Sequence, residues 1–158
     1  TFSSGTTSSD GYKWFKKSGD LTIDSAVNVN NSKVVLFVSG TLTIKDRINL
    51  DDGSGLFMTV VGGNIAIDKG VSHPTNPALE GLYFSDGTIS TGTTGLKNDN
   101  QLYIRGSLVA NGGFNLQRDG GDVNQTKPSE FFEYAPDLLF KYPSSLGVRS
   151  FIWKEVAP

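Results

Sequence analysis

Residues 33–67 read KVVLFVSGTLTIKDRINLDDGSGLFMTVVGGNIAI and contain the same pattern twice. Each copy has a solid apolar run, a corner of small residues and a short alternating stretch. The first copy is VVLFV-SG-TLTI, from Val34 to Ile44, and the second is LFMTVV-GG-NIAI, from Leu56 to Ile67. A run that is apolar on both faces is typical of a strand covered on both sides, whereas an alternating stretch is typical of a half-buried strand. A repeat of this size predicts a wound β-structure in which each copy forms one coil.

The alternating stretches recur along the whole middle of the chain. They begin at Leu21, Leu42, Ile65, Ile89 and Leu108. In the first three, aliphatic residues occupy the same two positions, as the pairs Leu21/Ile23, Leu42/Ile44 and Ile65/Ile67. Parallel stacking places these pairs in columns inside the coil and leaves Thr22, Thr43 and Ala66 outside.

These features predict an all-β chain, a right-handed parallel β-helix (β-solenoid) of about five coils between Gly19 and Arg118. Each coil is expected to have three strands, and the continuous ones are expected at 34–38, 56–61, 82–84 and 102–104. Helical periodicity is missing before Lys127, and glycines interrupt the chain at short intervals. An antiparallel sandwich is the alternative, because Asp52-Gly53 and Asp86-Gly87 are hairpin signals.

The 158 residues are expected to form one domain in three parts. Residues 1–18 form an N-terminal arm and cap, 19–121 the coils, and 122–158 a C-terminal cap with a strand at 130–134, a short helix from Pro136 and a closing strand at 150–156. The mixed aromatic and lysine residues of 12–17 are interpreted as a cover for the first coil. A base-stacking patch for single-stranded nucleic acid is the alternative for that segment.

Composition excludes several classes of site and partner. The chain has no cysteine, so disulfides and thiolate sites are excluded. A formal net charge of −2 makes nucleic acid an unfavoured partner. No apolar stretch reaches the roughly 20 residues of a membrane span. Since the chain begins at Thr1, we expect a processed product or an excised domain.

Few residues carry chemistry, and we predict no catalytic residue, no cofactor and no metal ligand. His73 is the single histidine and lies in a proline-bounded loop without a nucleophile motif. The carboxylates at 51–52 and 118–122 match no calcium-loop spacing, although calcium binding there remains the alternative to solvated turns. Glu130 and Glu133 are expected on opposite faces of one strand, which disfavours paired-carboxylate chemistry. Recognition is instead expected in the loops at 72–80 and 91–100.

The C-terminal part of the chain also resembles a known group of proteins. The residues that carry the resemblance are QLYIRGSLVAN at 101–111 and PSEFFEYAPDLL at 128–139, and the likeness extends over 101–158. This part is similar to secreted β-solenoid surface and type IV pilus-accessory, pilin-like proteins of small-genome, mostly uncultivated bacteria. In that group, a strand phrase of the form L-x-I-x-G-x-L-x-A is followed by P-[SA]-E-x-F-x-x-x-P-D and a terminal strand. The resemblance implies an extracellular or cell-surface, non-enzymatic β-solenoid.

The predicted function is therefore a non-enzymatic structural or adhesive surface module, with a pilin-like or filament-forming role. Its expected partners are other copies stacked end to end, other surface or pilus subunits, or a glycan. The alternatives are a β-helix that binds or degrades polysaccharide and a nucleic-acid-binding minor pilin-like protein. The aromatic residues of the tail are expected either to seal the last coil or to contact another chain.

Overall fold

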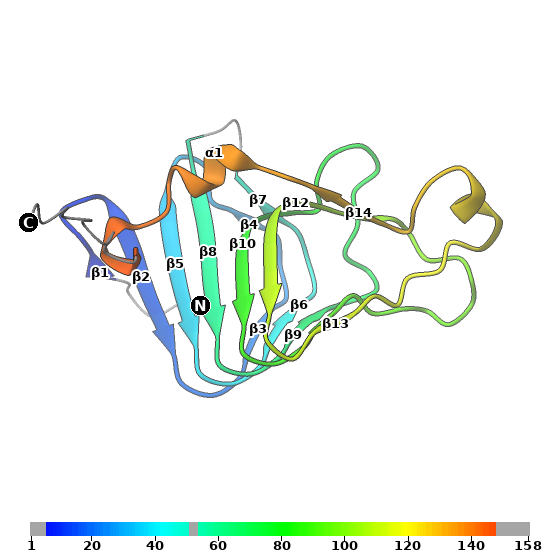
Figure 1. Ribbon diagram of the computed structural model, residues 1–158, viewed down its shortest axis with the longest axis horizontal. Helices are drawn as coiled ribbons and strands as arrows, with labels where there is room; N and C mark the ends of the chain where they lie inside the picture. Colours follow the sequence, from blue (N-terminus) through cyan, green and yellow to red (C-terminus); the bar gives the residue numbers. More distant parts are fainter. Residues whose placement is uncertain (1–5, 51–53, 148–158) are drawn as a thin grey trace, which may run out of the picture.

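The computed structural model describes residues 6–50 and 54–147 (Figure 1). The chain winds into a β-solenoid of about four turns with parallel sheets, which confirms the predicted all-β β-helix, although about five coils were expected. The sandwich alternative is wrong, because the strand at Lys33–Val38 pairs in parallel with the strands before and after it in the stack. The apolar run and the alternating stretch that follows it lie in different sheets.

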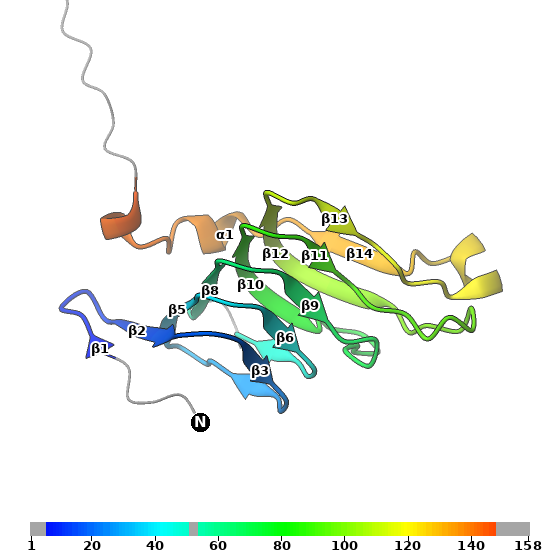
Figure 2. The ribbon, with the colours of Figure 1, turned by 90° about the horizontal axis from the view of Figure 1, so that it is seen from below.

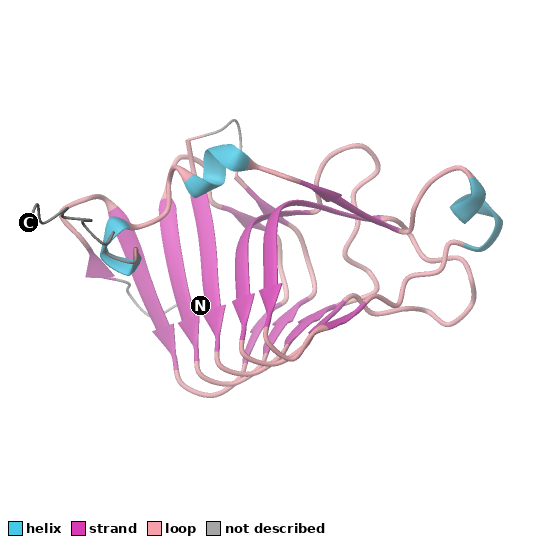
Figure 3. Ribbon diagram, in the orientation of Figure 1, coloured by secondary structure: helices cyan, strands magenta, loops and turns pink. Residues whose placement is uncertain are grey.

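Two sheets and a short third face make up the solenoid (Figures 1 and 3). The first sheet contains β1 (Thr6–Thr7), β2 (Tyr12–Lys17), β5 (Lys33–Val38), β8 (Leu56–Val61), β10 (Leu79–Ser85), β12 (Leu102–Ala110) and β14 (Glu130–Glu133) in that order. The second contains β3 (Leu21–Ile23), β6 (Leu42–Ile44), β9 (Ile65–Ile67), β11 (Ile89–Ser90) and β13 (Phe114–Asn115). The third face is formed by β4 (Val27–Asn28), β7 (Ile48–Asn49) and the first residues of β10 and β12.

The aliphatic columns lie where the repeat predicts them. In the second sheet, Leu42 pairs with Leu21 on one side and with Ile65 on the other. Leu42 and Ile65 are fully buried, whereas Thr43 between the two inward positions of its strand is only partly buried. The interior of the solenoid is therefore a continuous stack of apolar side chains.

One part of the predicted register is wrong. Residues 102–104 were expected to continue the first sheet and Leu108 to start the last strand of the second, but Leu82 pairs with Ser107 and Ile89 with Phe114. The reason is that β10 and β12 are long strands that turn from the third face into the first sheet at Gly81 and Gly106. These glycines have φ of 146° and 144°, and a Cβ on Gly106 would lie 1.8 Å from the Gly81 carbonyl oxygen.

A second line of glycines forms the corner between the first and second sheets. Gly63 N donates to the Gly40 carbonyl oxygen at 3.0 Å, and the same bond repeats from coil to coil. A Cβ on Gly63 would lie 2.7 Å from that oxygen, so the coils could not approach this closely with any other residue. The corner at 86–87, which resembled a hairpin signal, belongs to this line and joins two different sheets.

The first coil, at one end of the stack, has lysines at inward positions. Residues 12–17 were interpreted as a cover outside the coils, but they form β2, the first strand of the stack itself. In the described residues, β1 pairs with β2 in antiparallel fashion at Lys13 and Trp14. Lys13 and Lys17 occupy the positions that Val34 and Val38 fill in the next coil, on either side of Phe15. Inward-facing lysines on an edge strand oppose the addition of a further strand.

The segment after β13 first adds a strand to the first sheet and then returns across that sheet. After the 3₁₀ turn η1 (Gly121–Gln125), β14 adds a parallel strand to Leu102–Arg105 of β12. The chain then forms α1 (Pro136–Leu139) and the 3₁₀ turn η2 (Ser144–Leu146), and returns across the first sheet towards β2 (Figures 1 and 2). Tyr12 Oη donates to the Lys141 carbonyl oxygen at 2.9 Å, and Lys141 Nζ to that of Gly55 at 3.4 Å. The strand expected at 150–156 lies outside the described residues.

Candidate functional site

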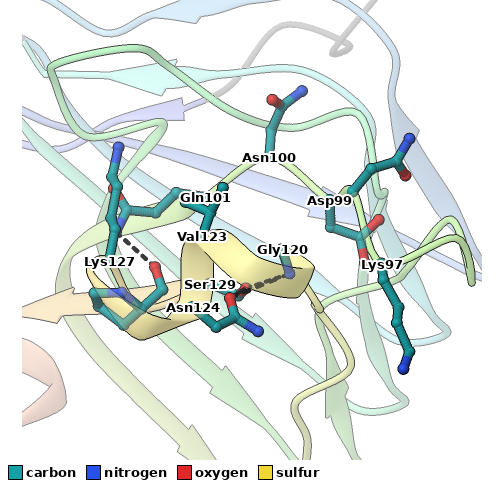
Figure 4. Close-up of a pocket in the computed structure, with 11 residues that line it drawn as sticks. Lys97, Asp99, Asn100, Gln101, Gly120, Val123, Asn124, Lys127 and Ser129 are labelled. Atoms are coloured by element: carbon teal, nitrogen blue, oxygen red, sulfur yellow. Dashed lines mark hydrogen bonds between the residues drawn. The ribbon is translucent and has the colours of Figure 1, made fainter.

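Two long connections project from the last coils at the end opposite β2 (Figure 1). They are residues 91–100, which follow β11, and residues 116–129, which follow β13. Between them is a cavity of about 330 Å³ whose lining residues are mostly of polar types (Figure 4). Its walls are formed by Lys97, Asn98, Asp99, Asn100, Gln101, Gly120, Val123, Asn124, Lys127, Pro128 and Ser129.

Arg118 fixes the base of these loops. Its side chain is buried, and its three guanidinium nitrogens donate to three main-chain carbonyl oxygens: those of Thr91 (Nε, 3.1 Å), Asn100 (Nη1, 2.9 Å) and Asp68 (Nη2, 2.8 Å). Burial lowers the pKa of the guanidinium, against the attraction of nearby carboxylates. One side chain thus binds carbonyl groups at both ends of residues 91–100 and one at the start of the connection that follows β9 (Ile65–Ile67).

Asp99 joins the two loops to each other. Its carboxylate accepts bonds from Thr93 Oγ1 at 2.6 Å and Thr94 N at 2.7 Å in one loop, and from Asp119 N at 3.0 Å in the other. The Thr93 bond, followed by the two main-chain donors, holds the pKa of Asp99 well below its ordinary value. The loops are therefore tied together by an ionised carboxylate.

The two glutamates of β14 point in opposite directions, as their spacing predicts. Glu130 Oε1 faces inward and accepts bonds from Thr91 Oγ1 at 2.8 Å and Arg118 N at 2.9 Å. Glu133 faces outward, where it accepts a bond from Tyr103 Oη and lies 3.4 Å from Arg105 Nε. Both carboxylates hold the structure together, and they do not form a facing pair.

Next to the loops, the interior of the last coil is open to solvent in the part of the chain that the structure describes. An apolar cavity of about 290 Å³ is lined by Ile104, Gly106, Leu108, Phe114, Leu116 and Phe132. Phe114 continues the column of Ile65 and Ile89, yet it is 50 % exposed, and Leu116 is 52 % exposed. Since β14 pairs only with Leu102–Arg105, the later residues of β12 have no strand beyond them in the described chain. The described part of the predicted C-terminal cap thus leaves this end open.

The residues singled out in the sequence are mostly engaged in their own loops. His73 Nδ1 accepts main-chain bonds from Thr75 at 3.2 Å and Asn76 at 2.9 Å, and Asp119 Oδ1 accepts from Gly121 N and Asn124 Nδ2. The carboxylates at 51–52 lie outside the described residues. In the described ranges, no three His, Asp or Glu side chains gather as a metal site. Helices long and apolar enough to cross a membrane do not occur in these ranges either.

Sequence reasoning missed the roles of Asp99 and Arg118. Both lie in polar loop sequence. The Arg118 side chain binds main-chain carbonyl groups up to 50 residues away, and Asp99 binds two main-chain N–H groups and the Thr93 hydroxyl. The sequence offered one weak signal for a buried role of Arg118, its position directly after the last apolar strand. Solvated arginines are equally common at such positions. Comparisons with known protein families, with curated proteins and with solved structures gave no match.

Proposed function

We propose that this chain is a non-enzymatic structural and adhesive module of the cell surface that binds its partner at the last-coil end. This end combines two features in one place. The open coil offers apolar contact through Phe114, Leu116 and Phe132, and the adjacent loops offer amide, hydroxyl and lysine groups around the polar cavity. An apolar centre with a polar surround is the usual composition of a protein-binding surface.

The observation that carries the proposal is the difference between the two ends of the solenoid. The inward positions of the first coil contain Lys13 and Lys17, whereas those of the last coil contain Leu108, Phe114 and Leu116. An exposed apolar core end is a liability unless something binds there. Within residues 6–50 and 54–147, lysines thus occupy inward positions at the first end, whereas apolar side chains are exposed at the last end.

A non-enzymatic role is supported by how the charged side chains are used. Among the described residues, ionisable groups come together around Arg118 and around Arg105, in bonds that fasten loops and the C-terminal segment to the coils. A polysaccharide-cleaving site needs carboxylates that face each other across a substrate groove. Glu130 and Glu133 lie on opposite faces of their strand and do not meet this requirement.

The same asymmetry bears on the kind of partner. Head-to-tail stacking of copies would place Lys13 and Lys17 against the apolar interior of the last coil, and burial of an ammonium group in apolar surroundings is costly. Another surface or pilus subunit, or a glycan held by the loops, therefore fits the end better than the first coil of a second copy. The proposed function therefore fits a filament subunit that is joined to its neighbours by a different protein.

The test is binding with matched end-face variants. Phe114→Ser combined with Leu116→Ser removes the apolar part, and Lys97→Ala combined with Lys127→Ala removes the charged part. Full chain and variants are compared on a glycan array, by pull-down from surface-protein extracts, and by light scattering for self-association. We expect binding to fall at least tenfold in one pair, while Thr22→Ser with Thr43→Ser on the second sheet binds normally. Turnover of a polysaccharide that a single Glu130→Gln or Glu133→Gln change abolishes would contradict the proposal.

A further inference from the structure

The cavity between the two projecting loops has walls that the protein itself holds in place. Asp99 of the first loop accepts a bond from Asp119 N of the second loop at 3.0 Å. Arg118 Nη1 donates to the Asn100 carbonyl oxygen at 2.9 Å, which fixes the main chain of the first loop at the cavity. Since these bonds lie within the protein, a ligand would not have to order the walls, and this favours its binding.

Three amide side chains offer donors and acceptors at this cavity. The Asn100 amide has no hydrogen bond to any described residue. Asn98 Oδ1 accepts a bond from Thr94 Oγ1 at 2.9 Å, which leaves Asn98 Nδ2 for a ligand. Gln101 Nε2 donates to the Pro128 carbonyl oxygen at 2.7 Å, which leaves Gln101 Oε1. A sugar hydroxyl group both donates and accepts hydrogen bonds, so this mixture of amide groups fits several hydroxyl groups at once.

The lining residues carry more positive than negative charge. Lys97 and Lys127 lie on opposite sides of the cavity (Figure 4), and both are exposed. Within the described ranges, neither ammonium group has a hydrogen bond or an ion pair. Asp99 is the one carboxylate among the lining residues, and its three hydrogen-bond donors and the nearby Arg118 already balance its charge. The two lysines are therefore available for an anionic group of a ligand.

Apolar side chains and the size of the cavity narrow the class of ligand further. Val123 is 57 % exposed and Pro128 is also exposed, so both can contact the C–H groups of a sugar ring. None of the 11 lining residues is aromatic, so the cavity has no stacking surface for a nucleobase. A cavity of about 330 Å³ lies at the small end of the range for ligand sites, which suits one sugar unit at a time.

We propose that this cavity binds an acidic sugar unit, a hexuronic acid, of a polysaccharide. Lys97 or Lys127 binds the carboxylate of the sugar, and the three amide side chains bind its hydroxyl groups. This inference rests on the proposed binding role of the last-coil end, and it names the class of glycan that the loops hold. The apolar surface of the open coil stays available for a protein partner, so the two sites can be tested separately.

Calorimetry with the full chain and oligosaccharides of galacturonic, glucuronic and mannuronic acid tests the charge requirement. Each is used as the free acid and as the methyl ester, which keeps the hydroxyl groups and removes the charge. We expect at least one free acid to bind at least tenfold more tightly than its ester, and Lys97→Ala with Lys127→Ala to weaken this binding at least tenfold. Lys16→Ala with Lys45→Ala, which removes two exposed lysines elsewhere, should bind normally. If no free acid binds, or if acid and ester bind equally, the inference is wrong.

A second variant tests the hydroxyl contacts. Asn100→Ala should fold normally, because this amide has no bond to a described residue, and it should weaken the binding of the free acid about threefold. Asn115→Ala, at an exposed outward position of the second sheet, is the matched control. Dextran sulfate that binds as tightly as the free acids would show attraction by charge alone and overturn the inference. The proposed protein contact is measured separately by pull-down with Phe114→Ser and Leu116→Ser. If that variant loses its partner while no uronic acid binds, the sugar site alone is refuted.

Discussion

Arg105 and Asp137 are joined by a contact of 2.5 Å between Nη2 and Oδ1, which fastens the C-terminal segment to the longest strand of the solenoid. The same guanidinium lies 3.4 Å from Glu133 Oε1 and 3.8 Å from Glu80 Oε1. Burial alone would raise the pKa of Asp137, but the hydrogen bond and charge of Arg105 outweigh it and lower that pKa. One side chain thus connects β10, β14 and α1.

Replacing Arg105 by methionine should loosen the C-terminal segment before it unfolds the coils. Three carboxylates lose their common partner, and because the site is partly exposed we expect a loss of about 1–2 kcal/mol in the free energy of unfolding. Limited proteolysis should cut residues 134–147 faster in the variant. Arg47→Met, which removes an exposed pair with Asp46 at 3.8 Å, is the control and should change neither property measurably. Equal protection of the segment in both variants would show that Arg105 does not hold it.

The bond between Tyr103 and Glu133 should make stability depend on alkaline pH. The hydroxyl donates to the Glu133 carboxylate, and this bond, followed by burial, raises the pKa of Tyr103 from 10.0 to about 12. A pKa that is higher in the folded state gives stability that is fully present below pH 10 and is lost as the pH rises towards 12. The difference in unfolding free energy between the natural chain and Tyr103→Phe should therefore shrink across this window, as measured by urea titration at several pH values. A constant difference from pH 9 to pH 12 would rule out the effect.

Thr59 is a polar residue in the apolar interior, and its replacement should stabilise the protein. It is fully buried between Leu36 and Tyr83 in the register, and its Oγ1 has no hydrogen-bond partner. Thr59→Val keeps the shape and removes the unsatisfied hydroxyl, so we expect a gain of about 1–2 kcal/mol in chemical denaturation. Thr43→Val, at an outward position, should change stability by less than about 0.5 kcal/mol. A loss of stability in Thr59→Val would indicate that the hydroxyl is satisfied in solution.

The glycine corner should not tolerate a methyl group. A Cβ on Gly63 would lie 2.7 Å from the Gly40 oxygen and 2.9 Å from its carbonyl carbon, both main-chain atoms that cannot rotate away. We expect Gly63→Ala to cost about 2–3 kcal/mol, since the coils must move apart. At Gly70, the nearest atom to a new Cβ is a side-chain oxygen of Asp68 at 3.2 Å, so Gly70→Ala is the matched control. Similar melting temperatures for the two variants would contradict the close-stacking argument.

Arg118 should be required for the loop end but not for the rest of the solenoid. Arg118→Met leaves the carbonyl groups of Asp68, Thr91 and Asn100 without this donor in a buried place, and we expect a loss of more than about 3 kcal/mol. Arg118→Lys keeps the charge but offers a single nitrogen, so it should restore only part of the stability. Hydrogen exchange should show the loss first in residues 91–100 and 117–129. Uniform loss of protection in all coils would mean that Arg118 supports the whole stack.

The sequence by itself determined the repeating part of the fold, because each coil repeats a local pattern. Inward aliphatic positions such as Leu42 and Ile65, and glycine corners such as 62–63, recur in nearly the same order, and parallel stacking follows from that recurrence. It also gave the opposite directions of Glu130 and Glu133, since their odd spacing in a strand is sufficient. The solid apolar run of 34–38 indicated a sheet covered on both faces, which the returning C-terminal segment partly provides.

Only the tertiary structure decided the ends and the loops. Whether residues 134–147 seal the last coil or return towards Tyr12 depends on contacts across more than 100 residues, and no local pattern encodes that choice. The register at residues 102–108 depended on Gly81 and Gly106 meeting at one corner, although each alone resembles an ordinary turn glycine. The sequence also could not predict that Arg118 binds three distant carbonyl groups. Every residue has a main-chain carbonyl group, so the sequence does not show which ones accept a bond. Local repetition therefore determined the coils, whereas long-range contacts made once in the chain determined the candidate site.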